Sequence, residues 1–226
     1  MSHRRGLFIT FEGTEGSGKT TQMRLLVARL RANGYVVTEN QEPGATAVGK
    51  EIRCILLDPA HSEMAPMTEL LMMFASRTQA AAEIVIPALE RDEIVVSDRF
   101  TDSTLAYQGE ARGLGFDTVL QVHRLALDGL LPDLTICVDL DIATGLERAH
   151  QRNEGSGTAR SEARIDRQSL DFHLRVGEGY REIAAAEPER FRMVDGAGDP
   201  TEVAERVWKE VCPVLNQYTV RANRQN

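Results

Sequence analysis

The segment Gly13–Thr20, with the sequence GTEGSGKT, constrains this chain more than any other part of its sequence. It fits the pattern G-x-x-x-x-G-K-[ST], in which glycines let backbone N–H groups close around a phosphate. A strand-like run, LFITFE, precedes the motif, and a helical pattern, TTQMRLLVARL, follows it. Because the N-terminus of a helix attracts anions, this strand–loop–helix unit predicts a site for a nucleoside triphosphate.

The chemistry of the motif assigns its residues to a nucleoside triphosphate and a metal ion. Lys19 reaches the β- and γ-phosphates, and the hydroxyl of Thr20 suits Mg²⁺. Asp98 ends a strand-like run, and we expect it to bind the ion directly or through water. The residues of this segment that are expected to contact the triphosphate are Gly13, Thr14, Glu15, Gly16, Ser17, Gly18, Lys19, Thr20 and Thr21.

Short apolar runs alternate with amphipathic stretches along the whole chain. Strands are predicted at 6–12, 35–39, 93–98, 134–140 and 190–194, and helices at 19–33, 47–57, 67–89, 117–129, 142–151, 166–186 and 201–215. Strands rich in Ile and Val, separated by helices, are typical of a parallel sheet covered on both faces. We predict one three-layer α/β domain over residues 1–226, with a five-stranded parallel sheet and a frayed tail at 217–226.

Composition excludes some partners. The chain has 26 Lys and Arg against 34 Asp and Glu, which gives a net charge of −8. This charge argues against a protein whose main role is to bind a nucleic acid polymer or an anionic membrane. An anionic ligand then requires cations that are concentrated locally. The chain contains no apolar run of the roughly 18 residues that a membrane helix needs, and no signal-peptide pattern. Its three scattered cysteines suit a reduced, cytoplasmic protein.

Two classes of phosphate-binding protein compete at this point: a phosphotransferase for a small acceptor, and a nucleotide-dependent switch or motor. A guanine-binding switch normally carries N-K-x-D, but none of Lys19, Lys50 and Lys209 follows an asparagine. A motor usually needs a longer chain. Arg99 directly follows the strand at 93–98, and ligands of open α/β sheets bind at strand ends. The sequence therefore favours a kinase for a small acceptor.

Several segments beyond the phosphate loop resemble bacterial thymidylate kinases along most of the chain. They are FEGTEGSGKTTQ at 11–22, EPGAT at 42–46, TELLMMFASRTQ at 68–79, SDRFTDSTLAYQG at 97–109, LPDLTICVDLD at 131–141 and ARIDRQSLDFHLRVGEGYREIA at 163–184. The most specific is D-R-[FY]-x-x-S-x-x-A-Y-Q at 98–108. The resemblance implies a P-loop kinase fold with a mobile lid, a homodimer, and ATP- and Mg²⁺-dependent phosphorylation of dTMP to dTDP in dTTP biosynthesis.

The resemblance also assigns dTMP contacts. Arg99 and Arg53 are expected to clamp the acceptor phosphate, a task that suits the bidentate fork of arginine. Thr104 and Gln108 are expected at the thymine edge, and Tyr107 under the sugar, where it disfavours a 2′-hydroxyl. The full expected set is Glu15, Arg53, Met73, Phe74, Arg77, Arg99, Thr104, Tyr107, Gln108 and Tyr180.

Catalysis is implied to need a cation over the transferring phosphoryl group. Some family members carry an arginine in the phosphate loop where this chain has Gly16, so the charge is expected from a lid at roughly 148–165. That segment contains Arg148, Arg152, Arg160 and Arg164, and the resemblance makes Arg148 an expected ATP contact in addition to residues 13–21. The expected catalytic residues are Lys19, Glu15, Arg99, Arg152 and Arg160.

The residue that covers thymine is left open between two neighbours. In the family, the stacking phenylalanine lies four residues before the helix arginine. Counting back from Arg77 gives Met73, whereas Phe74 lies three residues before it. Both positions share nearly the same helix face as Arg77, so either side chain is a candidate.

Three alternative functions remain. Another nucleoside monophosphate kinase differs only in base preference, and a deoxynucleoside kinase has no acceptor phosphate for two arginines to bind. A regulatory nucleotide-binding protein belongs to a different class, and it predicts binding or hydrolysis without acceptor-dependent turnover.

Overall fold

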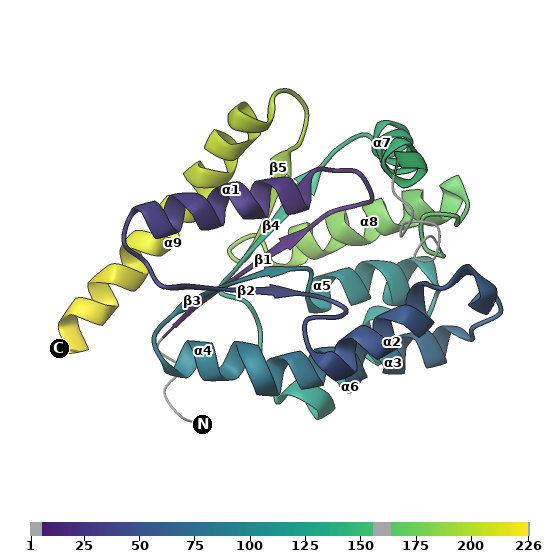
Figure 1. The fold of residues 1–226 in the computed structure, drawn as a ribbon, viewed down its shortest axis with the longest axis horizontal. Helices are drawn as coiled ribbons and strands as arrows, with labels where there is room; N and C mark the ends of the chain where they lie inside the picture. Colours follow the sequence, from purple (N-terminus) through teal and green to yellow (C-terminus); the bar gives the residue numbers. More distant parts are fainter. Residues whose placement is uncertain (1–5, 156–163, 226) are drawn as a thin grey trace.

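A five-stranded parallel sheet forms the centre of the molecule (Figure 1). The structure is a computed structural model, and it describes residues 6–155 and 164–225, with the side chains of 152–155 and 221–225 left out. The strands are β1 (Leu7–Glu12), β2 (Val37–Gln41), β3 (Ile94–Asp98), β4 (Leu134–Asp139) and β5 (Phe191–Asp195). Their order is β2-β3-β1-β4-β5, and every pair is parallel. The predicted sheet is confirmed.

Helices surround this sheet. The α-helices are α1 (Lys19–Ala32), α2 (Ala47–Leu57), α3 (Pro66–Ala80), α4 (Ile86–Glu90), α5 (Thr101–Thr104), α6 (Phe116–Leu127), α7 (Ile142–Gly155), α8 (Leu170–Ala186) and α9 (Pro200–Gln225). A short 3₁₀ helix (Pro59–His61) precedes α3, and π-helical segments follow α3 (Ala81–Val85) and α5 (Leu105–Ala111). Within the described residues, no helix is both long enough and apolar enough to span a membrane.

The two faces of the sheet carry separate apolar cores. Side chains alternate between faces along a strand, so the neighbours Phe8 and Ile9 of β1, both fully buried, enter different clusters. Helices α1 and α9 cover the face of Ile9. Helices α3, α4, α6 and α8 cover the face of Phe8 (Figure 1). This double cover explains why the strands read as continuous apolar runs, and it confirms the three-layer prediction.

The parallel arrangement brings the candidate residues to one edge of the sheet. In the register of β1 and β3, Phe11 lies opposite Asp98, so both strands end at the same level. The loop that starts at Gly13 and the turn at Arg99 therefore leave the sheet side by side. Ligands of open α/β sheets bind at this carboxyl edge.

One predicted helix is divided in the structure. The sequence predicts a continuous helix over 67–89, but α3 ends at Ala80, a π-helical turn follows, and α4 begins at Ile86. Pro87 lies at the start of α4. Since proline has no N–H and its ring crowds the preceding turn, it interrupts the helical hydrogen bonds there.

Other predicted boundaries differ as well. The helix expected from 166 begins at Leu170, because the hydroxyl of Ser169 accepts a hydrogen bond from the Phe172 N–H at 3.2 Å and caps it. The helical segment at 101–111 was not predicted, since its polar sequence shows no helical period. It is buried nevertheless, and it forms one wall of the site.

The last helix is longer than expected. It continues to Gln225, whereas the sequence predicts an end near 215 and a frayed tail over 217–226. Two tyrosines hold this end against the body of the protein. The Tyr218 hydroxyl donates to the carbonyl of Asp92 at 2.8 Å, and the hydroxyls of Tyr35 and Thr219 lie 3.2 Å apart.

Candidate functional site

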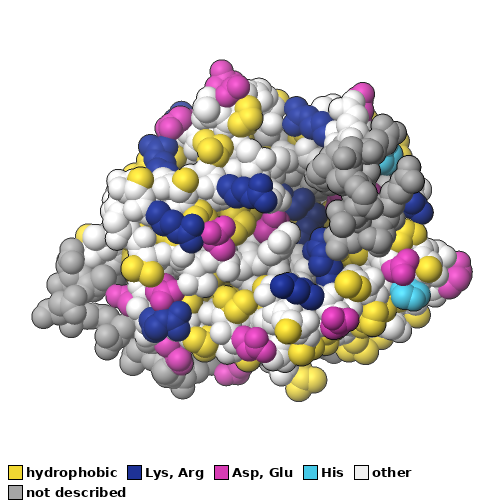
Figure 2. Space-filling view, viewed as in Figure 1, with side chains coloured by type: hydrophobic (Ala, Val, Ile, Leu, Met, Phe, Trp, Pro, Cys, Tyr) yellow, Lys and Arg dark blue, Asp and Glu magenta, His cyan; other side chains and the backbone are white. Residues whose placement is uncertain are grey.

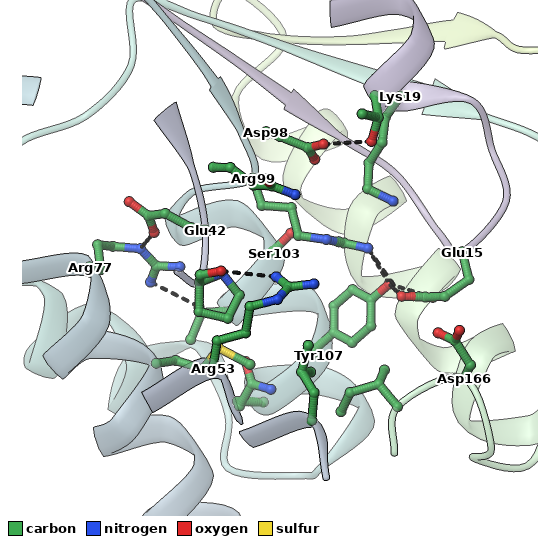
Figure 3. A pocket seen from close by; sticks show the side chains of 18 of the residues that line it. Glu15, Lys19, Glu42, Arg53, Arg77, Asp98, Arg99, Ser103, Tyr107 and Asp166 are labelled. Carbon is green, nitrogen blue, oxygen red and sulfur yellow. Dashed lines mark hydrogen bonds and ion pairs between the residues drawn. The ribbon is translucent and has the colours of Figure 1, made fainter. Parts of the chain in front are cut away.

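A cavity of about 490 Å³ opens at the carboxyl edge of the sheet (Figure 3). Figure 2 shows Lys and Arg side chains gathered around the hollow between α1 and α2, although the chain as a whole is acidic. The local concentration of cations that an anionic ligand requires is therefore present. Predicted residues that line this cavity are Glu15, Gly16, Lys19, Thr20, Arg53, Met73, Arg77, Asp98, Arg99, Thr104, Tyr107 and Gln108.

A second cavity of about 280 Å³ lies on the other side of the phosphate loop. Its lining includes Thr21 and Arg148, both expected ATP contacts. It also includes Gly196 and Gly198 from the loop after β5, which the sequence analysis missed although a glycine pair after a strand is a usable signal. The two cavities share Gly16, Lys19 and Thr20, so they meet at the loop.

The phosphate loop packs tightly against α7. Gly16 has φ 69°, and a Cβ built on it would lie 1.9 Å from the carbonyl oxygen of Gly145. A side chain at this position would collide with backbone, so this loop has no room for an arginine at position 16. At the base of the loop, Lys19 donates from Nζ to the carbonyl of Thr14 at 3.3 Å.

The two predicted metal residues are in contact. The Thr20 hydroxyl donates to Oδ2 of Asp98 at 2.6 Å, although the residues are 78 positions apart. Hydroxyl and carboxylate oxygens are the donors that Mg²⁺ prefers. The described residues contain no cluster of three or more His, Cys, Asp or Glu that could hold a metal. The oxygen pair therefore suits an ion that takes its other ligands from phosphates and water.

Arg99 connects the phosphate loop to the wall of the cavity. Its Nη1 donates to the hydroxyls of Ser103 at 2.8 Å and Tyr180 at 3.2 Å. Its Nη2 donates to Oε1 of Glu15 at 3.1 Å and to the Tyr107 hydroxyl at 3.2 Å. The guanidinium is thereby fixed at both ends, while its edge still borders the cavity (Figure 3).

Glu15 remains ionised in this setting. Burial raises its pKa, but contacts with His173 and with the cations Arg99 and Lys19 lower it more, so the pKa lies well below its ordinary value. Both oxygens of its carboxylate lie within hydrogen-bond distance of the Tyr107 hydroxyl, at 2.8 Å for Oε1 and 2.6 Å for Oε2, so they share its one proton. Nδ1 of the fully buried His173 lies 3.4 Å from Oε2. The sequence analysis gave His173 no role.

Glu12 is a second carboxyl that the sequence analysis missed. It ends β1, it is fully buried, and its Oε1 accepts the Phe100 N–H at 2.7 Å. Oε2 accepts hydrogen bonds from Ser103 and Tyr180. Burial, followed by the nearby charge of Asp102, raises the pKa of Glu12 to about 7. A carboxyl at the end of an otherwise apolar strand was the available signal.

Glu12 supports an uncommon backbone conformation at Arg99. Arg99 has φ 70°, in the left-handed region that most residues avoid. Its N–H donates to the carbonyl of Phe11 at 2.9 Å, and its carbonyl accepts the Ser97 hydroxyl at 2.7 Å. With the bond from Phe100 to Glu12, these contacts hold the turn that directs the Arg99 side chain.

Arg77 is anchored rather than mobile. Its Nε lies 2.5 Å from Oε2 of Glu42, and both side chains are buried. Nη1 donates to Oγ1 of Thr104 at 2.9 Å, and Nη2 donates to the carbonyl of Phe100 at 3.0 Å. Because Oγ1 of Thr104 accepts this hydrogen bond from Arg77, the hydroxyl proton of Thr104 is left for another acceptor.

The two candidates for covering a base lie in different places. Met73 lines the cavity, whereas Phe74 is buried in the core beneath it, with its ring 5.1 Å from Cζ of Arg77. Tyr180 is also buried behind Arg99 rather than at the cavity. Arg53 does line the cavity, and its Nη1 donates to the carbonyl of Pro43 at 2.9 Å.

The lid arginines have different positions. Arg164 is buried, and its Nη2 lies 2.7 Å from Oε2 of Glu69, so it is not the mobile cation that the lid expectation included. An arginine in a buried ion pair is held by its partner carboxylate. Arg160 and the side chain of Arg152 lie outside the described residues.

Comparisons with known proteins agree with this geometry. The family model described as thymidylate kinase matches residues 11–207. The thymidylate kinase of Pelobacter propionicus is 48% identical over 206 residues, which cover 91% of this chain and 94% of that relative. That of Citrifermentans bemidjiense is 50% identical over 194 residues, 86% of each chain. The crystal structure of thymidylate kinase from Ehrlichia chaffeensis is 31% identical, with TM-score 0.72, covering 91% of this chain and 98% of that one.

Proposed function

Because the chain belongs to the thymidylate kinase family and phosphorylates dTMP to dTDP with ATP, we propose that its two cavities are the acceptor and donor sites of this reaction. The larger cavity takes dTMP, and the smaller one takes ATP. The observation that carries this proposal is that both cavities share Gly16, Lys19 and Thr20. A phosphoryl group bound there lies between the two sites, next to the Lys19 ammonium.

In the acceptor site, we assign the phosphate of dTMP to Arg99 and Arg53. Arg99 suits this role because its contacts with Glu15 and Ser103 fix the guanidinium at the wall of the larger cavity, beside the phosphate loop. Glu15 and Tyr107 form one hydrogen-bonded pair, and we place them beside the sugar. A rigid ring there leaves little room for a 2′-hydroxyl.

The opposite end of the cavity is assigned to thymine. Arg77, Thr104 and Gln108 line that end with polar groups, and Met73 supplies the apolar cover. We choose Met73 over Phe74 because Phe74 is already packed in the core.

The donor site is assigned to the triphosphate and its metal ion. Backbone N–H groups of the loop and the N-terminus of α1 favour phosphate, and Arg148 borders the same cavity. Thr20 and Asp98 would hold Mg²⁺ directly or through water, and the ion would neutralise charge on the phosphates. Arg152 and Arg160 stay our candidates for the lid cation over the transferring group.

The assembly is proposed to be a homodimer. Large apolar side chains are exposed on α2, α3 and α6, which pack beside one another. They are Val48, Ile55, Met67, Leu71 and Leu125, and Leu125 is 90% exposed. A second copy of the chain would cover this face. The mass of one chain is 25.0 kDa, and sedimentation equilibrium should give twice this value. A monomer at micromolar concentration would refute the assignment.

The cellular location and the pathway of the enzyme are inferred from its substrates. We place the enzyme in the cytoplasm, as one domain that supplies dTDP for dTTP biosynthesis. Its partners are then ATP and dTMP, and the net charge of −8 gives no support to binding of a nucleic acid polymer.

An acceptor-dependence assay tests these assignments. ADP formation is measured with ATP and Mg²⁺ while dTMP, dUMP, dGMP, UMP and thymidine are offered separately. Turnover should be highest with dTMP and negligible with thymidine, which has no phosphate for Arg99. Removal of Mg²⁺ by a chelator should lower the rate by at least about 100-fold. Equal turnover without any acceptor would instead indicate a nucleotide hydrolase.

A further inference from the structure

A buried carboxylate lies behind the proposed base end of the acceptor cavity. Glu69 of α3 is fully buried. Its Oε1 accepts Nε2 of Gln108 at 2.7 Å and Nε of Arg112 at 3.2 Å. Its Oε2 lies 3.2 Å from Nη2 of Arg112 and 2.7 Å from Nη2 of Arg164. Gln108 is the member of this group that lines the cavity on its other side.

Glu69 keeps its negative charge in this position. Burial raises its pKa, but the charge of Arg112 and the hydrogen bond from Gln108 lower it more, so the pKa lies below the ordinary value for glutamate. An ionised carboxylate only accepts hydrogen bonds. The side of the Gln108 amide that meets Glu69 must therefore be the NH₂ group.

The orientation of the Gln108 amide decides which of its atoms faces the cavity. Rotating the Gln108 amide by 180° would bring Oε1 against the carboxylate of Glu69, which places two acceptors together in a buried site. The observed orientation leaves Oε1 for the cavity. Among the described residues, no hydrogen bond to this oxygen is present, so it is available to a ligand.

We propose that Glu69 is a positioning residue that fixes the amide of Gln108 with its acceptor oxygen toward the base, so that the site selects a base with an N–H at that edge. This inference rests on the proposed placement of dTMP. Thymine presents N3–H between two carbonyl groups, whereas cytosine presents an unprotonated N3 there. An acceptor held in one orientation favours the first base and rejects the second.

The same carboxylate also holds the wall next to Gln108. Arg112 donates from Nη1 to Oε1 of Gln168 at 2.9 Å, and the backbone N–H of Arg164 donates to the carbonyl of Leu57 at 3.0 Å. Leu57 and Ile165 line the acceptor cavity. Glu69 therefore holds the orientation of the Gln108 amide and also the shape of the neighbouring cavity wall. A test must separate these two roles.

Kinetics with two substrates separate them. The substrates are dTMP and 5-methyl-dCMP, which keeps the ring and the methyl group of dTMP but presents an unprotonated N3 and a 4-amino group. The wild-type enzyme should prefer dTMP in kcat/KM by roughly 30-fold or more. In Glu69→Gln, the neutral amide accepts either orientation of Gln108, so the preference should fall by about 10-fold. The loss should arise mainly in KM for dTMP rather than in kcat.

Three further variants act as controls. Glu69→Asp keeps a carboxylate in the site but is one methylene shorter, so its hydrogen bond to Gln108 should lengthen and the preference should fall even if Glu69→Gln folds poorly. Gln108→Met should remove the preference almost completely. Glu182→Gln, an exposed change on α8, should leave both rates unchanged.

A measurement on the unaltered enzyme needs no substitution at Glu69. The side-chain NH₂ of Gln108 should give slowly exchanging ¹⁵N-correlated NMR signals that persist when dTMP is added, because Nε2 stays on Glu69. The proposal is overturned if this NH₂ loses its protection on binding, if Gln108→Met keeps the preference, or if both Glu69 variants slow the two substrates equally. Absence of dTMP turnover in the unaltered enzyme would refute the proposed function itself.

Discussion

Replacing Arg99 by lysine is expected to lower kcat/KM for dTMP by roughly 100-fold or more. The guanidinium spans two sets of acceptors, with Nη1 on Ser103 and Tyr180 and Nη2 on Glu15 and Tyr107. A single ammonium cannot reach both sets. It would leave the carboxylate of Glu15 poorly compensated in a buried setting, and it would offer the acceptor phosphate one point of contact instead of a fork.

Steady-state kinetics with dTMP and a separate ATP-binding measurement check this expectation. Binding of ATP should change little, because Arg99 lines the larger cavity and not the smaller one. Arg181→Lys, an exposed change on α8, serves as the matched control and should retain full activity. A value of kcat/KM within about threefold of the unaltered enzyme would show that Arg99 does not bind the acceptor phosphate.

Gly16→Ala is expected to reduce activity by about 100-fold or more, through displacement of the phosphate loop. The new Cβ would overlap the carbonyl oxygen of Gly145, since the ideal position lies only 1.9 Å from it. Backbone on both sides of this contact leaves no flexible side chain to move away. The loop or α7 must shift, and either movement disturbs the N–H groups that would surround the phosphates.

A second glycine separates collision from conformational strain. Gly34 has φ 85° and open space around its Cβ position, so Gly34→Ala suffers only from the left-handed backbone. This variant should lose about 1 kcal/mol in the free energy of unfolding while its activity stays unchanged. Thermal unfolding and binding of an ATP analogue are measured on both variants. If Gly16→Ala binds the analogue as tightly as the unaltered protein, the contact with Gly145 does not shape the loop.

The phosphate site was predictable because its information is local. A strand, a glycine-rich loop and a helix are consecutive in the chain, so the motif from Gly13 to Thr20 fixes their geometry without help from distant residues. The alternation of apolar strands and amphipathic helices likewise predicts a covered parallel sheet. Asp98 and Arg99 were predictable as neighbours of the loop, because parallel strands end at a common edge.

The partners of buried polar groups were not predictable in the same way. Glu12 and Glu69 are single carboxylates in apolar surroundings, and nothing beside them in the sequence names Phe100, Arg112 or Arg164 as a partner. These contacts join residues that are 43 to 95 positions apart in the chain, and they depend on how the helices pack on the sheet. Helical spacing also predicted Met73 and Phe74 on one face of their helix. It shows which way a side chain points from the helix axis, but not how deeply that side chain is buried in the folded protein.

The phosphate loop and the class of fold could be predicted from the sequence because motifs and periodic patterns record local geometry. The family resemblance named most of the residues that line the larger cavity. The folded structure was needed to place Arg164 against Glu69, Met73 rather than Phe74 at the cavity, and Glu12 at the turn of Arg99. These features could not be predicted because burial and ion pairing depend on contacts between distant segments. Such contacts exist only after the chain has packed around its sheet.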